Sequence, residues 1–95
     1  MLAMILVAGI SRYQLDEVLY DAASQFGGAS AYQLRGSWLS PNGEVIVEDS
    51  WRIDIFIDKS MLPAIKAWAK HLAVKYRQQE VGLVVTAGDY EPVRP

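Results

Sequence analysis

A regularly alternating stretch from Val45 to Ile57 constrains the fold most. Successive side chains of a β-strand point to opposite faces, so this stretch predicts one long strand with two different faces. One face would enter a core with Val45, Val47, Trp51, Ile53, Ile55 and Ile57. The other would carry Ile46, Glu48, Ser50, Arg52, Asp54 and Phe56. We therefore expect any functional site on this second, more polar face.

A second strand is expected immediately before this one, between Ser30 and Ser40. Its alternation places four residues on one side: Tyr32, Leu34, Gly36 and Trp38. The segment Pro41-Asn42-Gly43 then has the composition of a turn, because proline fixes one torsion and Asn-Gly tolerates positive φ. The two strands are thus predicted to be joined by this turn.

The first of two amphipathic helices is predicted to begin after Ser11. Ser11 and Gln14 have the spacing of a capping box, and Gly27-Gly28 ends the helix. Its apolar residues recur at three- and four-residue steps and form one stripe. These residues are Leu15, Val18, Leu19, Ala22, Ala23 and Phe26.

The second helix is expected to begin at Asp58 or Ser60 as its cap, with Pro63 tolerated in the first turn. Its core stripe would be Leu62, Ile65, Ala69, Leu72 and Tyr76, flanked by Met61 and Trp68. Lys66, Lys70 and Arg77 fall together on an exposed flank. The opposite strip of Ala64, Ala67, His71 and Val74 would face either another subunit or solvent.

Apolar runs at Ala3–Ile10 and Val81–Thr86 predict two further strands, so the element order is βαββαβ. Right-handed crossovers turn this order into a four-stranded antiparallel sheet, strand order 4-1-3-2, with both helices on one face. This α+β architecture is the ferredoxin-like fold. We expect one domain at residues 1–87 and a C-terminal tail at 88–95.

Composition limits the possible function classes. Nine Lys and Arg against eleven Asp and Glu give a net charge of -2, which argues against nucleic-acid binding. The absence of cysteine excludes thiolate catalysis and thiolate metal sites, and one histidine, His71, cannot form a multi-histidine cluster. No apolar run is long enough to span a bilayer. We expect a cytoplasmic protein without a cofactor, a metal or a membrane partner.

Self-association is expected from the apolar content, which is 52% hydrophobic and 11% aromatic. In the predicted topology the first and third strands are central. Apolar side chains would therefore flank a polar ladder on the helix-free face, formed by Glu48, Ser50, Arg52 and Asp54. A second copy that covers this face would enclose the ladder as a pocket.

Glu48 is the first choice for a functional residue. A carboxylate on a central strand has a raised pKa if a partner covers it, which suits acid–base work or binding of a ligand's ammonium or hydroxyl groups. The alternative is an ion pair with Arg35 or Arg52 on a solvated sheet. Trp38 and Tyr32 would stack on a planar ligand such as a nucleobase, or pack in an oligomer interface.

Several of these residues also carry a resemblance. The residues that carry it are Gly36-x-Trp38, Gly43, Glu48-x-Ser50 and, after a basic helix, Gln79-x-Val81-x-Leu83-Val84-Val85. In these residues the chain is similar to a family of small bacterial and phage proteins of unknown function. More distantly, the chain resembles the phage S-adenosylmethionine lyases, first called hydrolases, from about Ile5 to Val85. Those enzymes are ferredoxin-like trimers with the active site between subunits. They counter host restriction by removing the methyl donor.

The resemblance implies roles for two residues. Glu48 falls on the family glutamate, which holds the substrate or balances its charge. Trp38 falls on the family tyrosine, with an indole in place of a phenol, and the Trp38–Glu48 spacing is one residue shorter. In the lyase reaction the substrate's own carboxylate attacks, and methylthioadenosine and homoserine lactone are released. Such an enzyme works mainly by positioning its substrate.

Our main hypothesis is therefore a lyase-like, homotrimeric phage protein that binds an adenosine-type ligand at a subunit interface in the cytoplasm of its host. Glu48 would be the catalytic residue, and the ligand contacts would be Trp38, Tyr32, Ser50, Arg52 and Arg35. Two alternatives remain open. One is an oligomer that sequesters a nucleotide without changing it, and the other is a structural or protein-interaction module.

Overall fold

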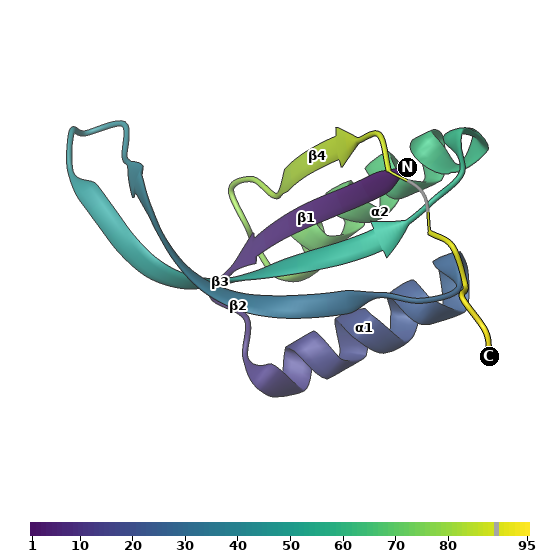
Figure 1. The fold of residues 1–95 in the computed structure, drawn as a ribbon. Helices are drawn as coiled ribbons and strands as arrows, with labels where there is room; N and C mark the ends of the chain where they lie inside the picture. The colour runs from purple at the N-terminus through teal and green to yellow at the C-terminus, as the bar shows by residue number, and fades with distance from the viewer. Residues whose placement is uncertain (89) are drawn as a thin grey trace.

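The computed structural model describes residues 1–88 and 90–95. Its elements are β1 (Leu2–Ala8), α1 (Arg12–Phe26), β2 (Ser30–Leu39), β3 (Val45–Phe56), a 3₁₀ turn (Lys59–Met61), α2 (Leu62–Lys75) and β4 (Gly82–Thr86). The sheet is antiparallel throughout, with the order β2-β3-β1-β4 (Figure 1). The predicted βαββαβ order and ferredoxin-like sheet are thus confirmed.

The core lies between one face of the sheet and the two helices. Its largest fully buried side chains come from four elements: Ile5 and Val7 of β1, Ile53 and Ile55 of β3, Val18 of α1, and Ile65 and Leu72 of α2. These strand residues all have odd numbers, as the alternation predicts. The even-numbered side chains of the same strands therefore form the helix-free face of the sheet.

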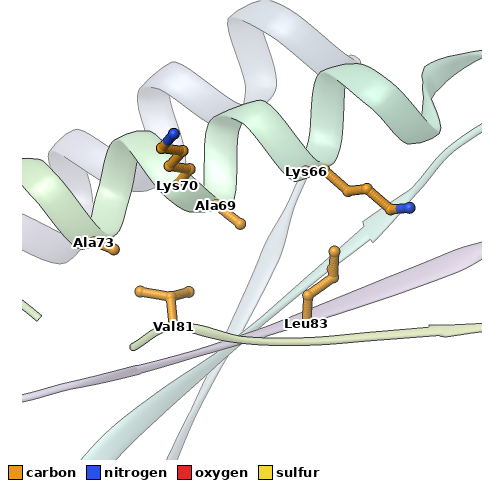
Figure 2. A pocket seen from close by; sticks show the side chains of 6 residues that line it. All are labelled: Lys66, Ala69, Lys70, Ala73, Val81 and Leu83. Carbon is orange, nitrogen blue, oxygen red and sulfur yellow. The ribbon is translucent and has the colours of Figure 1, made fainter. Parts of the chain in front are cut away.

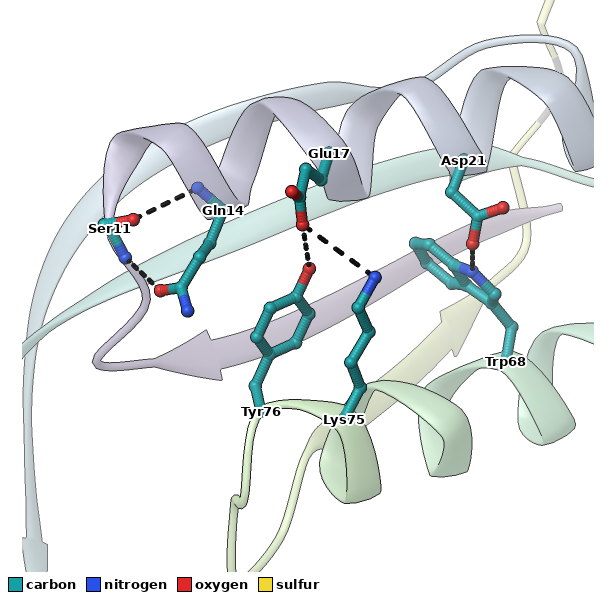
Figure 3. Close-up of polar contacts among 7 residues, drawn as sticks. All are labelled: Ser11, Gln14, Glu17, Asp21, Trp68, Lys75 and Tyr76. Carbon is teal, nitrogen blue, oxygen red and sulfur yellow. Dashed lines mark hydrogen bonds and ion pairs between the residues drawn. The ribbon is translucent and has the colours of Figure 1, made fainter.

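Polar contacts join the two helices where they lie side by side (Figure 3). The indole Nε1 of Trp68 donates a hydrogen bond to Asp21 Oδ2 at 2.7 Å. Glu17 Oε2 accepts a hydrogen bond from the Tyr76 hydroxyl at 3.4 Å and forms an ion pair with Lys75 Nζ at 3.8 Å. The hydrogen bond from Trp68, more than any other group, lowers the pKa of Asp21 below its usual value.

The helix starts differ in how well they follow the sequence pattern. At α1 the capping box is present, because the Ser11 amide donates to Gln14 Oε1 at 2.8 Å and the Gln14 amide donates to Ser11 Oγ at 3.1 Å. At the second helix the expected cap is wrong. A 3₁₀ turn follows Asp58, whose side chain makes no capping hydrogen bond, and α2 begins only at Leu62. Trp68 is buried in the core rather than at its flank.

A long arm projects from the domain, formed by the turn end of the β2–β3 hairpin (residues 35–49). β1 pairs with β3 only from Ser50 to Phe56. From Val45 to Asp49, β3 therefore has β2 as its single neighbour in the described part of the sheet. In Figure 1 this arm curves away from the helices, and the molecule measures 51 × 26 × 24 Å. The expectation that Val45 and Val47 enter the core is therefore wrong, because no helix reaches them. They are 70% and 53% exposed.

A four-residue turn closes the arm. The amide of Gly43 donates to the carbonyl oxygen of Ser40 at 3.0 Å, and Gly43 has a φ of 86°. The Ser40 amide donates to the carbonyl oxygen of Glu44 at 2.8 Å, which begins the ladder. A positive φ strains most side chains, so the glycine of Pro41-Asn42-Gly43 suits this position.

Candidate functional site

The candidate residues on the helix-free face divide into two groups. Glu48 and Trp38 lie on the projecting arm, where Gly36 pairs with Glu48 and Trp38 with Ile46. Tyr32 and Arg52 pair with each other over the sheet body. Ser50 is half-buried on β3 between the two groups. One face of the hairpin thus carries five of the six predicted site residues.

Trp38 and Glu48 contact each other directly on the arm. The indole Nε1 of Trp38 donates a hydrogen bond to Glu48 Oε1 at 3.0 Å. The two residues are diagonal neighbours across the β2–β3 ladder, a separation that a long aromatic side chain spans. The interaction uses Oε1 of Glu48, and within residues 1–88 and 90–95 the other carboxylate oxygen, Oε2, forms no hydrogen bond or ion pair. The glutamate therefore keeps acceptor capacity for a ligand.

The expected ion pair of Glu48 with an arginine does not form in the described residues. Arg35 instead forms an ion pair with Asp49 at 3.0 Å, on the opposite face of the arm. Arg52 forms its ion pair with Asp54. Arg35 therefore lies away from the other predicted ligand contacts, since odd and even positions of β2 point in opposite directions.

Arg52 is held in one orientation at the sheet centre. Its Nε and Nη2 donate to the two carboxylate oxygens of Asp54 at 2.9 and 2.8 Å. Its guanidinium also lies 4.9 Å from the centre of the Tyr32 ring. The hydrogen bonds to Asp54 raise the pKa of Arg52 above its ordinary value. The result is a rigid cationic plane on the helix-free face.

This arrangement changes two expectations for the sheet centre. Arg52 occupies one side of the Tyr32 ring, so the cation already uses a stacking surface that we expected for a nucleobase. Asp54 was not among the predicted contacts, yet it is the buried carboxylate of the ladder, only 8% exposed. Its position two residues after Arg52, on the same face of one strand, is the sequence signal that identifies the pair.

Two clefts in the described part of the chain lie away from the predicted site residues. Figure 2 shows the first, between α2 and the segment at β4, lined by Lys66, Ala69, Lys70, Ala73, Val81 and Leu83. The second lies beside both helices, lined by Tyr13, Asp16, Glu17, Tyr20, Asp21, His71 and Lys75. The predicted site is therefore an open surface on a single chain.

Two further observations concern ligands and membranes. Among residues 1–88 and 90–95, no group of three or more His, Asp or Glu side chains is arranged to hold a metal ion. In the same residues no helix is both long and apolar enough to cross a bilayer.

Known structures resemble the fold of this chain, whereas no known sequence family matches it. No protein-family model matches the chain, and no curated protein matches it. A phage SAM lyase in complex with S-methyl-5'-thioadenosine superposes with a TM-score of 0.67 at 20% identity, covering 95% of this chain and 92% of the lyase. The same type of enzyme in its apo state gives 0.64 at 20% identity, covering 95% and 91%.

A second kind of protein shares the fold. CutA from Synechococcus elongatus PCC7942 superposes with a TM-score of 0.72 at 12% identity, over 92% of this chain and 76% of CutA. At these identities the likeness establishes the fold. The distant resemblance to phage SAM lyases is thereby confirmed at the level of structure.

Proposed function

We propose that this protein is a SAM lyase-like enzyme that binds an adenosine-type ligand on the helix-free face of its arm. The observation that carries the proposal is the hydrogen bond from Trp38 Nε1 to Glu48 Oε1 at 3.0 Å. The resemblance places a tyrosine at Trp38, and the indole N–H supplies a donor to the glutamate where a phenol would. The likeness in fold to the phage lyases supports the same assignment.

The proposed reaction requires no proton transfer by the protein. A carboxylate oxygen of S-adenosylmethionine forms a bond to its own γ-carbon, and the bond from that carbon to sulfur breaks. The bonding electron pair moves to sulfur, so the sulfonium becomes the neutral thioether of methylthioadenosine, and homoserine lactone is the other product. The enzyme accelerates this step by holding the substrate in the folded, reactive conformation.

The residues of the arm match these requirements. Glu48 carries a negative charge that complements the ammonium and sulfonium groups of the substrate, and its Oε2 accepts from an ammonium or a hydroxyl. The hydrogen bond from Trp38 fixes the orientation of this carboxylate. The indole, 39% exposed, also offers an apolar surface to the adenine.

We propose further that a second copy covers the arm. The face of the arm opposite the site carries Leu39, Val45 and Val47, all more than half exposed. The cleft between α2 and β4 has a complementary apolar floor of alanines, Val81 and Leu83 (Figure 2). Such an area of exposed apolar surface is typical of an interface.

The sheet edges support the same contact. Within the described residues, β2 pairs with β3 alone and β4 pairs with β1 alone, so each presents an unpaired edge. An arm from one copy against the cleft of the next is a contact between two different patches. Such a heterologous contact forms a ring when its rotation closes, and three subunits are the smallest such ring. We therefore propose a homotrimer with the site between subunits, in the cytoplasm where its substrate is made.

The test is direct. Purified protein is incubated with S-adenosylmethionine, and methylthioadenosine and homoserine lactone are measured by liquid chromatography with mass spectrometry. We expect both products in equal amounts. Absence of methylthioadenosine above the protein-free control would refute the lyase. Recovery of intact S-adenosylmethionine from the denatured complex would instead identify a binder that sequesters it.

A further inference from the structure

Gly36 lies in the middle of β2, directly opposite Glu48 on the site face. Glycine in a strand interior destabilises a sheet by loss of chain entropy and of side-chain packing. A glycine is placed in a strand for one of a few physical reasons, namely a positive φ, a bulge, a bend, or the close approach of another group.

The first two reasons do not apply to Gly36. Its φ lies outside the left-handed region, unlike that of Gly43 in the turn. The β2–β3 ladder runs without a bulge from Ser30, paired with Asp54, to Leu39, paired with Val45, since the two residue numbers of every pair sum to the same value. Gly36 therefore has the regular backbone of an ordinary strand residue.

Packing inside the chain does not explain the glycine either. A Cβ built on Gly36 meets no atom within 4 Å. Gly82 provides the contrast, because a Cβ there lies 3.3 Å from the Cβ of Leu6. Curvature of the arm is also insufficient, since β3 follows the same curve (Figure 1) with a side chain at every position from Val45 to Phe56. Close approach by a group outside the chain remains.

The open surface above Gly36, called the notch below, is flanked by two side chains. Trp38 lies next along the same face of β2, and Glu48 lies across the ladder. The hydrogen bond between these two side chains at 3.0 Å holds both beside the notch. The floor is the bare peptide backbone of β2. A flat group can lie on such a floor at van der Waals distance, with an aromatic ring and a carboxylate acceptor at its edges.

We infer that the notch over Gly36 receives the planar heterocycle of the ligand, which makes Gly36 a specificity-determining position of the site. This inference rests on the proposed function, which supplies the adenine ring as the occupant. A methyl group at residue 36 would lift the ring from the backbone and separate it from Trp38. The change affects binding without touching the chain's own packing.

The experiment compares the binding of methylthioadenosine to the wild type, Gly36→Ala and Gly28→Ala by isothermal titration calorimetry. Gly28 is the matched control, because a Cβ there also meets no atom within 4 Å and its φ is not positive. One extra methyl in a filled site weakens binding by about 10- to 200-fold. We expect a loss of this size for Gly36→Ala and unchanged binding for Gly28→Ala, with the melting temperature of Gly36→Ala equal or higher.

The outcomes distinguish this inference from the proposed function. Equal affinity of Gly36→Ala and the wild type overturns the inference and leaves the proposed function standing. A change in the number of subunits for Gly36→Ala, measured as the molar mass of the assembly by light scattering, also overturns it. The notch would then receive a second copy of the chain. Failure of the wild type to bind methylthioadenosine or to produce it refutes the proposed function and the inference together.

Discussion

The side chain of Glu48 illustrates how a local register selects one partner among several. Its interaction partner is the indole of Trp38, whereas Arg35 and Arg52 each bind a neighbouring aspartate. The bare backbone at Gly36 leaves room beside the glutamate. The carboxylate is thus oriented by a neutral donor rather than by an arginine.

Replacing the charge of Glu48 tests its role in binding the substrate. Glu48→Gln retains an oxygen that accepts from Trp38 Nε1, so the fold should be unaffected. We expect kcat/KM for S-adenosylmethionine to fall about 100-fold, because the electrostatic match to the cationic substrate is lost. The matched control is Glu44→Gln at the turn, which should leave turnover unchanged. Wild-type activity in Glu48→Gln would contradict the assignment.

Two substitutions at Trp38 separate its hydrogen bond from its ring. Trp38→Phe retains an aromatic surface but removes the donor to Glu48, and a hydrogen bond to a charged group contributes about 1.5–3 kcal/mol. We expect at least about tenfold lower kcat/KM for Trp38→Phe. Trp38→Tyr restores a donor and should retain most of the activity. Equal activity of the two variants would show that the donor has no role.

At the scale of the elements, a hydrogen bond between Trp68 and Asp21 links α2 to α1 (Figure 3). It is supported by the edge-to-face contact of Trp68 with Phe26, whose ring centres lie 5.7 Å apart. These contacts join the two helices to each other on one side of the sheet. The candidate site residues Glu48 and Trp38 lie on the opposite face.

The Asp21 contact predicts a pH dependence of stability. The folded-state pKa of Asp21 lies below its ordinary value of 3.8, so the ionised form stabilises the fold above that pH. The contribution is lost as the pH falls from 3.8 through the folded-state pKa. We expect the free energy of unfolding to fall less steeply below pH 3.8 for Asp21→Asn than for the wild type. Parallel urea-denaturation profiles for the two proteins would contradict this.

At the scale of the whole molecule, the arm is the most distinctive feature. It gives an elongated shape, with apolar side chains on both of its faces. An isolated hairpin of this kind is marginally stable in water, so cover by a second copy would stabilise it.

Introducing a charged side chain on the apolar face of the arm tests the proposed homotrimer. Val45→Lys places an ammonium on the apolar face proposed to enter the cleft of the next subunit, while contacts within its own chain change little. We expect the trimer to dissociate to monomers in light scattering, with loss of lyase activity. Val74→Lys on α2, where the valine is 73% exposed, is the control and should remain trimeric. A wild-type protein that is monomeric would refute the proposed ring.

The amino-acid pattern alone was enough to predict the order of the elements, the topology and the two faces of β3. Periods of 2 and 3.6 report which side chains are apolar, and the connection rules allow few arrangements of βαββαβ. The sequence also predicted that Glu48 and Trp38 belong to one site, and the structure brings the two side chains into contact. The tertiary structure was needed to show that β3 extends beyond the end of β1 and carries Val47 beyond the helices. The length of a strand pattern in the sequence does not reveal where its pairing with a neighbouring strand ends. The tertiary structure alone decided that Glu48 binds Trp38, because side-chain partners depend on the register of the hairpin.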